Sequence, residues 1–231
     1  MGVGALMVLW VLALLDGPDP SLRGDQVATN LMVVKSLHPD WFQGDSLYGA
    51  EYLRFYTPSF IALQTSLARW SGGDPVAALK LLLWPVGFLF LVGHYLLFRA
   101  VTGHPLAAGL GAVSALAVRN ALGGDYWGFN GVASVQPRVI AEGMNPLLAL
   151  AFLRWRSHRF FPAFFLLVGG VANLHPISGF HLAQVTGLSH LWLSQFSRRA
   201  WKDVIAGAGL FALGALPFLL RYLPGKEHLA D

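Results

Sequence analysis

Acidic residues gather between the first and second apolar runs, and they are the side chains of this sequence best suited to general base catalysis. Residues 16–75 carry seven acids against four basic residues. Three of the acids, Asp25, Asp40 and Asp45, lie where helix ends or turns are expected. A carboxylate there could take a proton from an acceptor hydroxyl as that hydroxyl attacks. The alternative is structural: Asp25 caps a helix, and Asp40 and Asp45 occupy turns.

A second polar group begins the apolar segment 138–153, with an arginine and an acid four residues apart. Arg138 beside a membrane surface suits a phosphate group, because its guanidinium can contact two phosphate oxygens at once. Glu142 would be costly facing lipid, so we expect it to face other helices or a wet cavity. The alternative is that Arg138 and Glu142 bond each other along one helix face.

The third group centres on Asn173-Leu174-His175-Pro176, between two apolar segments. His175 could donate to a phosphate oxygen or carry a proton, or it could be a polar cap where one helix follows another. His175, His181 and Glu142 could also hold a divalent metal, although their spacing does not require one. The sequence has no cysteine, which excludes thiolate chemistry, disulfides and cysteine-ligated metals.

The composition of the elements that must position these residues indicates a membrane protein. The chain has 231 residues, of which 55% are hydrophobic and 12% charged, and its mean hydropathy is +0.54. Soluble domains usually contain about 25% charged residues, so too little polar surface remains to cover a globule in water. The net charge of +4 does not indicate nucleic-acid binding, because the basic residues lie in short clusters between apolar runs.

Apolar segments predict an all-α membrane protein with about seven transmembrane helices, forming one helical domain over residues 1–231. The expected spans are residues 2–15, 76–98, 105–118, 138–153, 160–174, 177–194 and 203–220. Alternate short loops carry seven basic residues on one side and four on the other, which places the N-terminus inside and the C-terminus outside. The predicted localisation is a bacterial cytoplasmic membrane, with the bundle over residues 76–220.

Residues 16–75 then form a long extracytoplasmic loop, in which helical periodicity predicts two short helices beside the membrane. The first helix begins at Asp25 and is expected to share one apolar face, made by Val27, Leu31, Val34 and Leu37. The second follows Pro58 and is expected to lie on the membrane surface. Its predicted apolar face is Phe60, Leu63, Leu67 and Trp70, opposite Gln64, Ser66 and Arg69.

This arrangement resembles the GT-C superfamily of membrane glycosyltransferases. The motifs that carry the likeness are Asp25-Gln26, then Lys35-Ser36-Leu37-His38-Pro39-Asp40-Trp41, then Tyr56-Thr57-Pro58. As architecture it covers roughly residues 1–200. Gln26 stands where many members have a second acid, and the chain is much shorter than usual, as an N-terminal half or truncated relative would be.

The resemblance implies transfer of a sugar from a polyprenyl-phosphate donor at the outer membrane face, with inversion at the anomeric carbon. The catalytic base would be Asp25, with Asp45 or Asp40 as substitutes. The lipid phosphate would be bound by Arg138 and His175, with Glu142 and Lys35 at the same site. The expected partners are membrane lipid and the polyprenyl-phosphate sugar donor, with a divalent metal possible and no nucleic acid.

Two other functions remain open on the sequence. One is a transporter or channel subunit, whose midplane path would be lined by Lys80, His94, Glu142, His181 and Gln184. The other is a non-catalytic assembly or scaffold protein, which is favoured if the outer acids and Arg138 do not come together.

Overall fold

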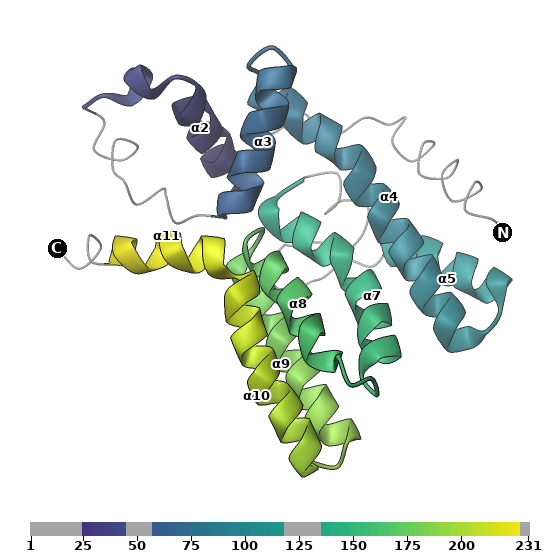
Figure 1. Ribbon diagram of the computed structural model, residues 1–231. Coiled ribbons are helices and arrows are strands. Elements are labelled where there is room, and N and C mark those ends of the chain that lie inside the picture. Colours follow the sequence, from purple (N-terminus) through teal and green to yellow (C-terminus); the bar gives the residue numbers. More distant parts are fainter. Residues whose placement is uncertain (1–24, 45–56, 118–134, 227–231) are drawn as a thin grey trace. The chain divides into compact units, whose positions relative to one another are not determined.

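The computed structural model describes residues 25–44, 57–117 and 135–226, and within these ranges the chain is helical with no strand (Figure 1). This confirms the all-α prediction. The expected span 2–15 lies outside the described residues. The elements are α2 (Asp25–Leu37), the 3-10 helix η1 (Pro39–Phe42), α3 (Pro58–Trp70), α4 (Pro75–Thr102), α5 (Pro105–Ala117), α7 (Pro137–Trp155), the 3-10 helix η3 (Phe161–Ala163), α8 (Phe164–Ala172), α9 (Pro176–Leu193), α10 (Arg198–Gly214) and α11 (Leu216–Lys226).

Local chemistry explains why the helices begin and end where they do. Five of them, α3, α4, α5, α7 and α9, begin at a proline, whose fixed φ suits the first helical position and whose missing N–H would have no partner there. At the start of α4, the Asp74 carboxylate accepts a hydrogen bond of 2.8 Å from the Val76 N–H. The same helix ends at Gly103, whose φ of 69° is the left-handed conformation that closes many helices.

The chain divides into two compact units, of which the first comprises Met1–Leu37 and Gln64–Leu150. Within it, α4 and α5 form a hairpin in which a Cβ at Gly111 would lie 2.8 Å from the ring of Phe98. The helix α7 approaches α4 as closely, because a Cβ at Gly93 would lie 2.8 Å from the ring of Pro146. Small residues therefore let these helix backbones come together, as is common in membrane proteins.

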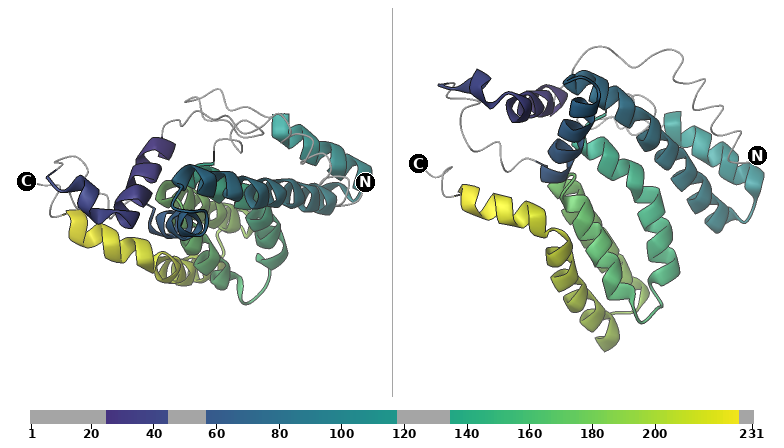
Figure 2. Two further views of the ribbon diagram at one scale, coloured as in Figure 1. Left: turned by 90° about the horizontal axis from the view of Figure 1, so that it is seen from above. Right: turned by 45° about the horizontal axis from the view of Figure 1, so that its top comes forward.

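The second unit comprises His38–Leu63 and Ala151–Asp231, and in it α8 packs against both α9 and α10 (Figures 1 and 2). A Cβ at Gly169 of α8 would overlap the Phe211 carbonyl oxygen of α10. On the α9 side, a Cβ at Gly179 would lie 2.7 Å from the backbone of Ala172. The three helices are thus in near backbone contact, and no side chain larger than hydrogen fits at Gly169 or Gly179.

A sharp bend separates α10 from α11 in the region predicted as one span over residues 203–220. The two helices differ in direction by 69° (Figure 2), so the predicted segment is a broken helix, and its assignment as a span stays a prediction. Pro217 has no N–H to donate and its ring blocks a continuous helix. The Asn173 side chain satisfies both sides of the bend. Its Nδ2 donates to the Gly214 carbonyl at 2.8 Å, and its Oδ1 accepts from the Phe218 N–H at 2.9 Å.

Of the helices described, α4 is long and apolar enough to cross a membrane, and the bent pair α10–α11 passes the same test when taken together. The apolar helices within Pro105–Ala115 and Phe161–Ala172 are shorter. Helices are present at every other predicted span that falls within the described residues. The count of seven spans nevertheless remains a prediction.

Periodicity located α2 and α3 correctly, and the structure adds which side of each helix is buried. In α2, Val27 is exposed, and the buried residues are Gln26, Thr29, Asn30, Met32 and Val33. In α3, Gln64 is fully buried whereas Trp70 is 78% exposed. Placement of the second helix on a membrane surface stays a prediction.

Candidate functional site

The first unit contains a buried cluster of amide side chains where α2, α3 and the start of α4 meet. Gln64 Nε2 donates to Asn30 Oδ1 at 2.6 Å and to the Pro75 carbonyl at 3.2 Å. Thr29 and Asn30 are both buried beside them. Asn30 Nδ2 and Gln64 Oε1 make no hydrogen bond with the described residues. The cluster therefore holds one unused donor and one unused acceptor, each costly to bury.

Gln26 connects this cluster to the beginning of α7. Its Nε2 donates to the Val135 carbonyl at 3.1 Å, and the residue is buried. Because Gln26 directly follows Asp25, this bond places the first turn of α2 beside the chain that leads into α7. The side chain of Asp25 itself lies outside what the structure describes. The backbone position that carries the predicted base is thus near the segment that carries Arg138.

Arg138 is the second residue of α7, and Glu142 follows one helical turn later. Both side chains are half-buried, and both make interactions in this structure. Lys35 lies in the last turn of α2, ten residues from Asp25. At 1.5 Å per residue, that separation is about 15 Å along the helix. The structure therefore brings the start of α2 to Val135, just before the helix that carries Arg138 and Glu142, and places Lys35 at the other end of α2.

The remaining predicted acids are less informative. Asp40 is exposed in η1, and its Oδ1 accepts a hydrogen bond of 2.8 Å from Gln43 Nε2. This geometry is that of a turn residue, as the structural alternative expects. Asp45 lies outside the described residues. Asp40 belongs to the second unit and Arg138 to the first.

His175, in the second unit, is 5% exposed and caps the N-terminus of α9. Its Nδ1 accepts from the Ser178 N–H at 3.2 Å and contacts Ser178 Oγ at 2.8 Å. A ring nitrogen that accepts a backbone hydrogen bond carries no proton, so the proton of the neutral ring is on Nε2. The structural role as a helix cap, which the sequence left open, therefore has direct support.

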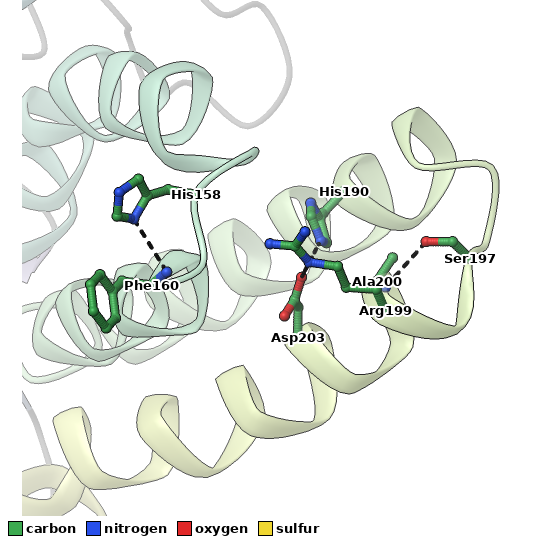
Figure 3. Close-up of polar contacts among 7 residues, drawn as sticks. All are labelled: His158, Phe160, His190, Ser197, Arg199, Ala200 and Asp203. Atoms are coloured by element: carbon green, nitrogen blue, oxygen red, sulfur yellow. Dashed lines mark hydrogen bonds and ion pairs between the residues drawn. The ribbon is translucent and has the colours of Figure 1, made fainter.

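Sequence reasoning missed a histidine–aspartate pair between α9 and α10, drawn in Figure 3. His190 Nε2 lies 3.3 Å from Asp203 Oδ2, and Arg199 Nε lies 3.9 Å from the same oxygen. The His190 ring also packs against Phe161, with 4.2 Å between ring centroids. A signal was available, since His190 and Asp203 stand on either side of the turn between two apolar segments.

Nothing within the described ranges places three or more histidine, aspartate or glutamate side chains close enough to hold a metal ion. His181 is exposed on α9, whereas His175 is buried. No protein-family model matches the chain, and comparison with curated proteins and with solved structures gave no match. Function must therefore be argued from the residues themselves.

Proposed function

We propose first that the chain is an integral membrane protein. The distribution of side chains supports this, because many large apolar residues are exposed while the apolar interior also encloses amide, hydroxyl and imidazole groups. Among the described residues, the buried polar ones are Gln26, Thr29, Asn30, Gln64 and Thr65 in the first unit, and Thr57, Asn173, His175, Thr186 and His190 in the second. Exposed apolar side chains include Leu110, Val185, Leu188, Ile205 and Leu220, which lie on α5, α9, α10 and α11. Exposed apolar surface on this scale suits lipid better than water.

We propose further that this membrane protein transfers a sugar from a polyprenyl-phosphate donor. The observation that carries this proposal is the hydrogen bond from Gln26 to Val135. It joins the helix that begins at Asp25 to the helix that carries Arg138 and Glu142. A base and a cation are both needed for this reaction, and they come from segments more than 100 residues apart in the sequence.

In this mechanism the Asp25 carboxylate takes the proton of the acceptor hydroxyl. The hydroxyl oxygen forms a bond to the anomeric carbon as the bond from that carbon to the phosphate oxygen breaks. The electron pair of the broken bond leaves with the polyprenyl phosphate. Arg138 stabilises the negative charge that develops on this leaving group, and Glu142 holds the arginine side chain in position from one turn away.

The test compares Asp25→Asn and Arg138→Ala with Asp40→Asn, which removes the same charge from an exposed residue of the same region. Purified full-length chain is added to membranes with a panel of radiolabelled polyprenyl-phosphate-linked hexoses and pentoses. The release of polyprenyl phosphate is measured. Loss of a general base typically costs 10²–10⁴-fold in rate, so Asp25→Asn should release polyprenyl phosphate at least about a hundredfold more slowly than the wild type. Asp40→Asn should match the wild type.

A fully active Asp25→Asn variant would show that Asp25 is not the catalytic base. An inactive Asp40→Asn variant would instead assign the base to Asp40 in η1. If the wild-type chain cleaves none of the donors, the transferase proposal fails and the non-catalytic assembly role takes its place. Circular dichroism in detergent confirms that each variant keeps its helices, so loss of activity is separated from loss of fold.

A further inference from the structure

The turn between α9 and α10 carries an open apolar groove that no step of the proposed reaction uses. The groove has a volume of about 420 Å³ and is lined by Leu188, Ser189, Trp192, Leu193 and Phe196. Trp192 is 73% exposed, and its ring meets Phe196 edge-on, with 6.2 Å between centroids. These large rings face outward at a helix end, which is the position that aromatic side chains favour at a membrane–water boundary.

The backbone of the turn is strained in a way that presents Phe196. Gln195 and Phe196 have φ values of 50° and 52°, a left-handed conformation that usually requires glycine. The turn is held by hydrogen bonds from the Phe196 N–H to Leu191 O at 2.8 Å and from the Gln195 N–H to Trp192 O at 3.0 Å. A phenylalanine in this conformation is unfavourable, and backbone strain of this kind gathers at functional sites.

Basic side chains surround the same end of the second unit. Arg198, Arg199 and Lys202 follow the groove on the first turn of α10 and are exposed. The others are Arg154, in the last turn of α7, and Arg156 and Arg159, in the loop that precedes η3. This loop reaches the same end because Phe161 packs on His190, with 4.2 Å between ring centroids. Figure 3 draws two other residues of this segment, His158 and Phe160. Residues 151–226 include eight lysines and arginines and one acid, Asp203.

Asp203 does not cancel this charge at the groove. Its carboxylate is directed to the buried His190 at 3.3 Å and to Arg199 at 3.9 Å. Arg198 is two residues from Phe196, and Lys202 is one helical turn beyond Arg198. Two exposed cations that Asp203 does not engage in the contacts above therefore follow Phe196 of the groove within six residues of the chain.

We propose that this groove and its two cations bind one anionic glycerophospholipid, with an acyl chain along Trp192 and Phe196 and the phosphate at Arg198 and Lys202. The charge of the groove's rim selects an anionic over a zwitterionic lipid, and the aromatic lining selects a lipid over a soluble phosphate. The proposal depends on the membrane location proposed above, but not on the transferase activity.

The test measures lipid retained by the purified full-length chain, using native mass spectrometry after release from detergent. Phosphatidylglycerol and phosphatidylcholine with the same acyl chains are titrated separately. Each cation near an anionic headgroup contributes about 1 kcal/mol, a factor of about five. The double variant Arg198→Ala/Lys202→Ala should therefore bind phosphatidylglycerol roughly thirty-fold more weakly, with phosphatidylcholine unchanged. Trp192→Ala should weaken both lipids.

The matched control is Arg154→Ala/Arg159→Ala, which removes the same charge from the same end but not from the groove. This variant should keep phosphatidylglycerol binding within a factor of about two. An equal loss in both double variants would mean general surface attraction and would overturn the site. If glycerol phosphate alone displaced phosphatidylglycerol, the site would be one for a soluble phosphate, and the proposal of a bound lipid would be wrong. A change from dimer to monomer in Trp192→Ala, with no lipid effect, would make the groove an interface between copies.

The outcome is independent of the transferase test. Arg198→Ala/Lys202→Ala should release polyprenyl phosphate from the sugar donors at the wild-type rate. A variant that loses lipid but keeps this activity supports the site whatever the fate of the Asp25 assignment.

Discussion

Replacing Asn173 with alanine should destabilise the second unit more than any other single polar-to-alanine change in it. The side chain is 5% exposed and holds the bend between α10 and α11 through Gly214 and Phe218. The Asn173 carbonyl also accepts from the Ser59 N–H at 3.1 Å, a backbone bond that alanine keeps. The substitution thus isolates the contribution of the side chain.

The expected magnitude follows from the two groups that lose their partner, the Phe218 N–H and the Gly214 carbonyl. A buried polar group left unsatisfied costs about 1–3 kcal/mol, so the free energy of unfolding should fall by roughly 2–5 kcal/mol. For a chain of this size, each kcal/mol lowers Tm by about 2–4 °C. Thermal unfolding followed by circular dichroism in detergent should therefore show a Tm lower by roughly 5–15 °C.

Two further variants make this measurement decisive. Asn173→Asp keeps the acceptor for Phe218 but directs a carboxylate at the Gly214 carbonyl, so it should also be destabilised. Gln184→Ala removes an exposed amide from α9 and should leave Tm unchanged within about 2 °C. An Asn173→Ala variant as stable as Gln184→Ala would refute the reasoning, because the bend would then be held by something other than this side chain.

Three further outcomes are expected from the geometry of the second unit. Gly169→Ala should lower the free energy of unfolding by about 1–3 kcal/mol, because its Cβ would overlap the α10 backbone. A Cβ at Gly170 would meet nothing within 4 Å, so Gly170→Ala should raise the free energy of unfolding by up to about 1 kcal/mol. Both changes are read from Tm. Gln195→Gly should raise the free energy of unfolding by about 1 kcal/mol, because glycine adopts the left-handed φ without strain. An unchanged Tm would show that Gln195 is not strained there. Asp203→Ala should lower the free energy of unfolding by about 1–3 kcal/mol, since His190 is left buried without that partner, and proteolysis at the α9–α10 turn should become faster.

The sequence was a good guide to where the helices lie, because their boundaries depend on local chemistry. Prolines at the first helical position, such as Pro75 and Pro176, and the glycine after Thr102 act within one turn of the chain. The predicted segment 177–194 and the observed α9 (Pro176–Leu193) therefore differ by a single residue at each end. Such signals need no knowledge of the tertiary structure.

Which side of a helix is buried depends on what surrounds it, and periodicity alone does not say. Of the apolar stripe Phe60, Leu63, Leu67 and Trp70, Phe60 is buried and Trp70 exposed. The buried line of α3 runs instead through Phe60, Gln64 and Ala68. If lipid is the solvent, exposed leucine and tryptophan cost nothing, and the interior goes to the side chains that need hydrogen bonds.

The candidate site was predictable in part for the same reason. Arg138, Glu142 and His175 attract attention as polar residues beside apolar segments, which can be read from the sequence. The bond between Gln26 and Val135 spans 109 positions, and no local pattern foretells it. Pro217, which interrupts the helix at the bend, can be read from the sequence. The side chain that holds the bend, Asn173, cannot, because it lies 41 residues before Gly214.

The shortness of α8 has a consequence for the order in which the protein is made. With η3, the apolar helix over Phe161–Ala172 has 12 residues, or about 18 Å at 1.5 Å per residue. A bilayer core of about 30 Å is too thick for such a segment to insert stably by itself. Its close partner, α10, begins only at Arg198. On the proposed membrane location, the nascent α8 would therefore stay in the bilayer only after α10 has left the ribosome, and a chain arrested before that point would expose α8 without its partner.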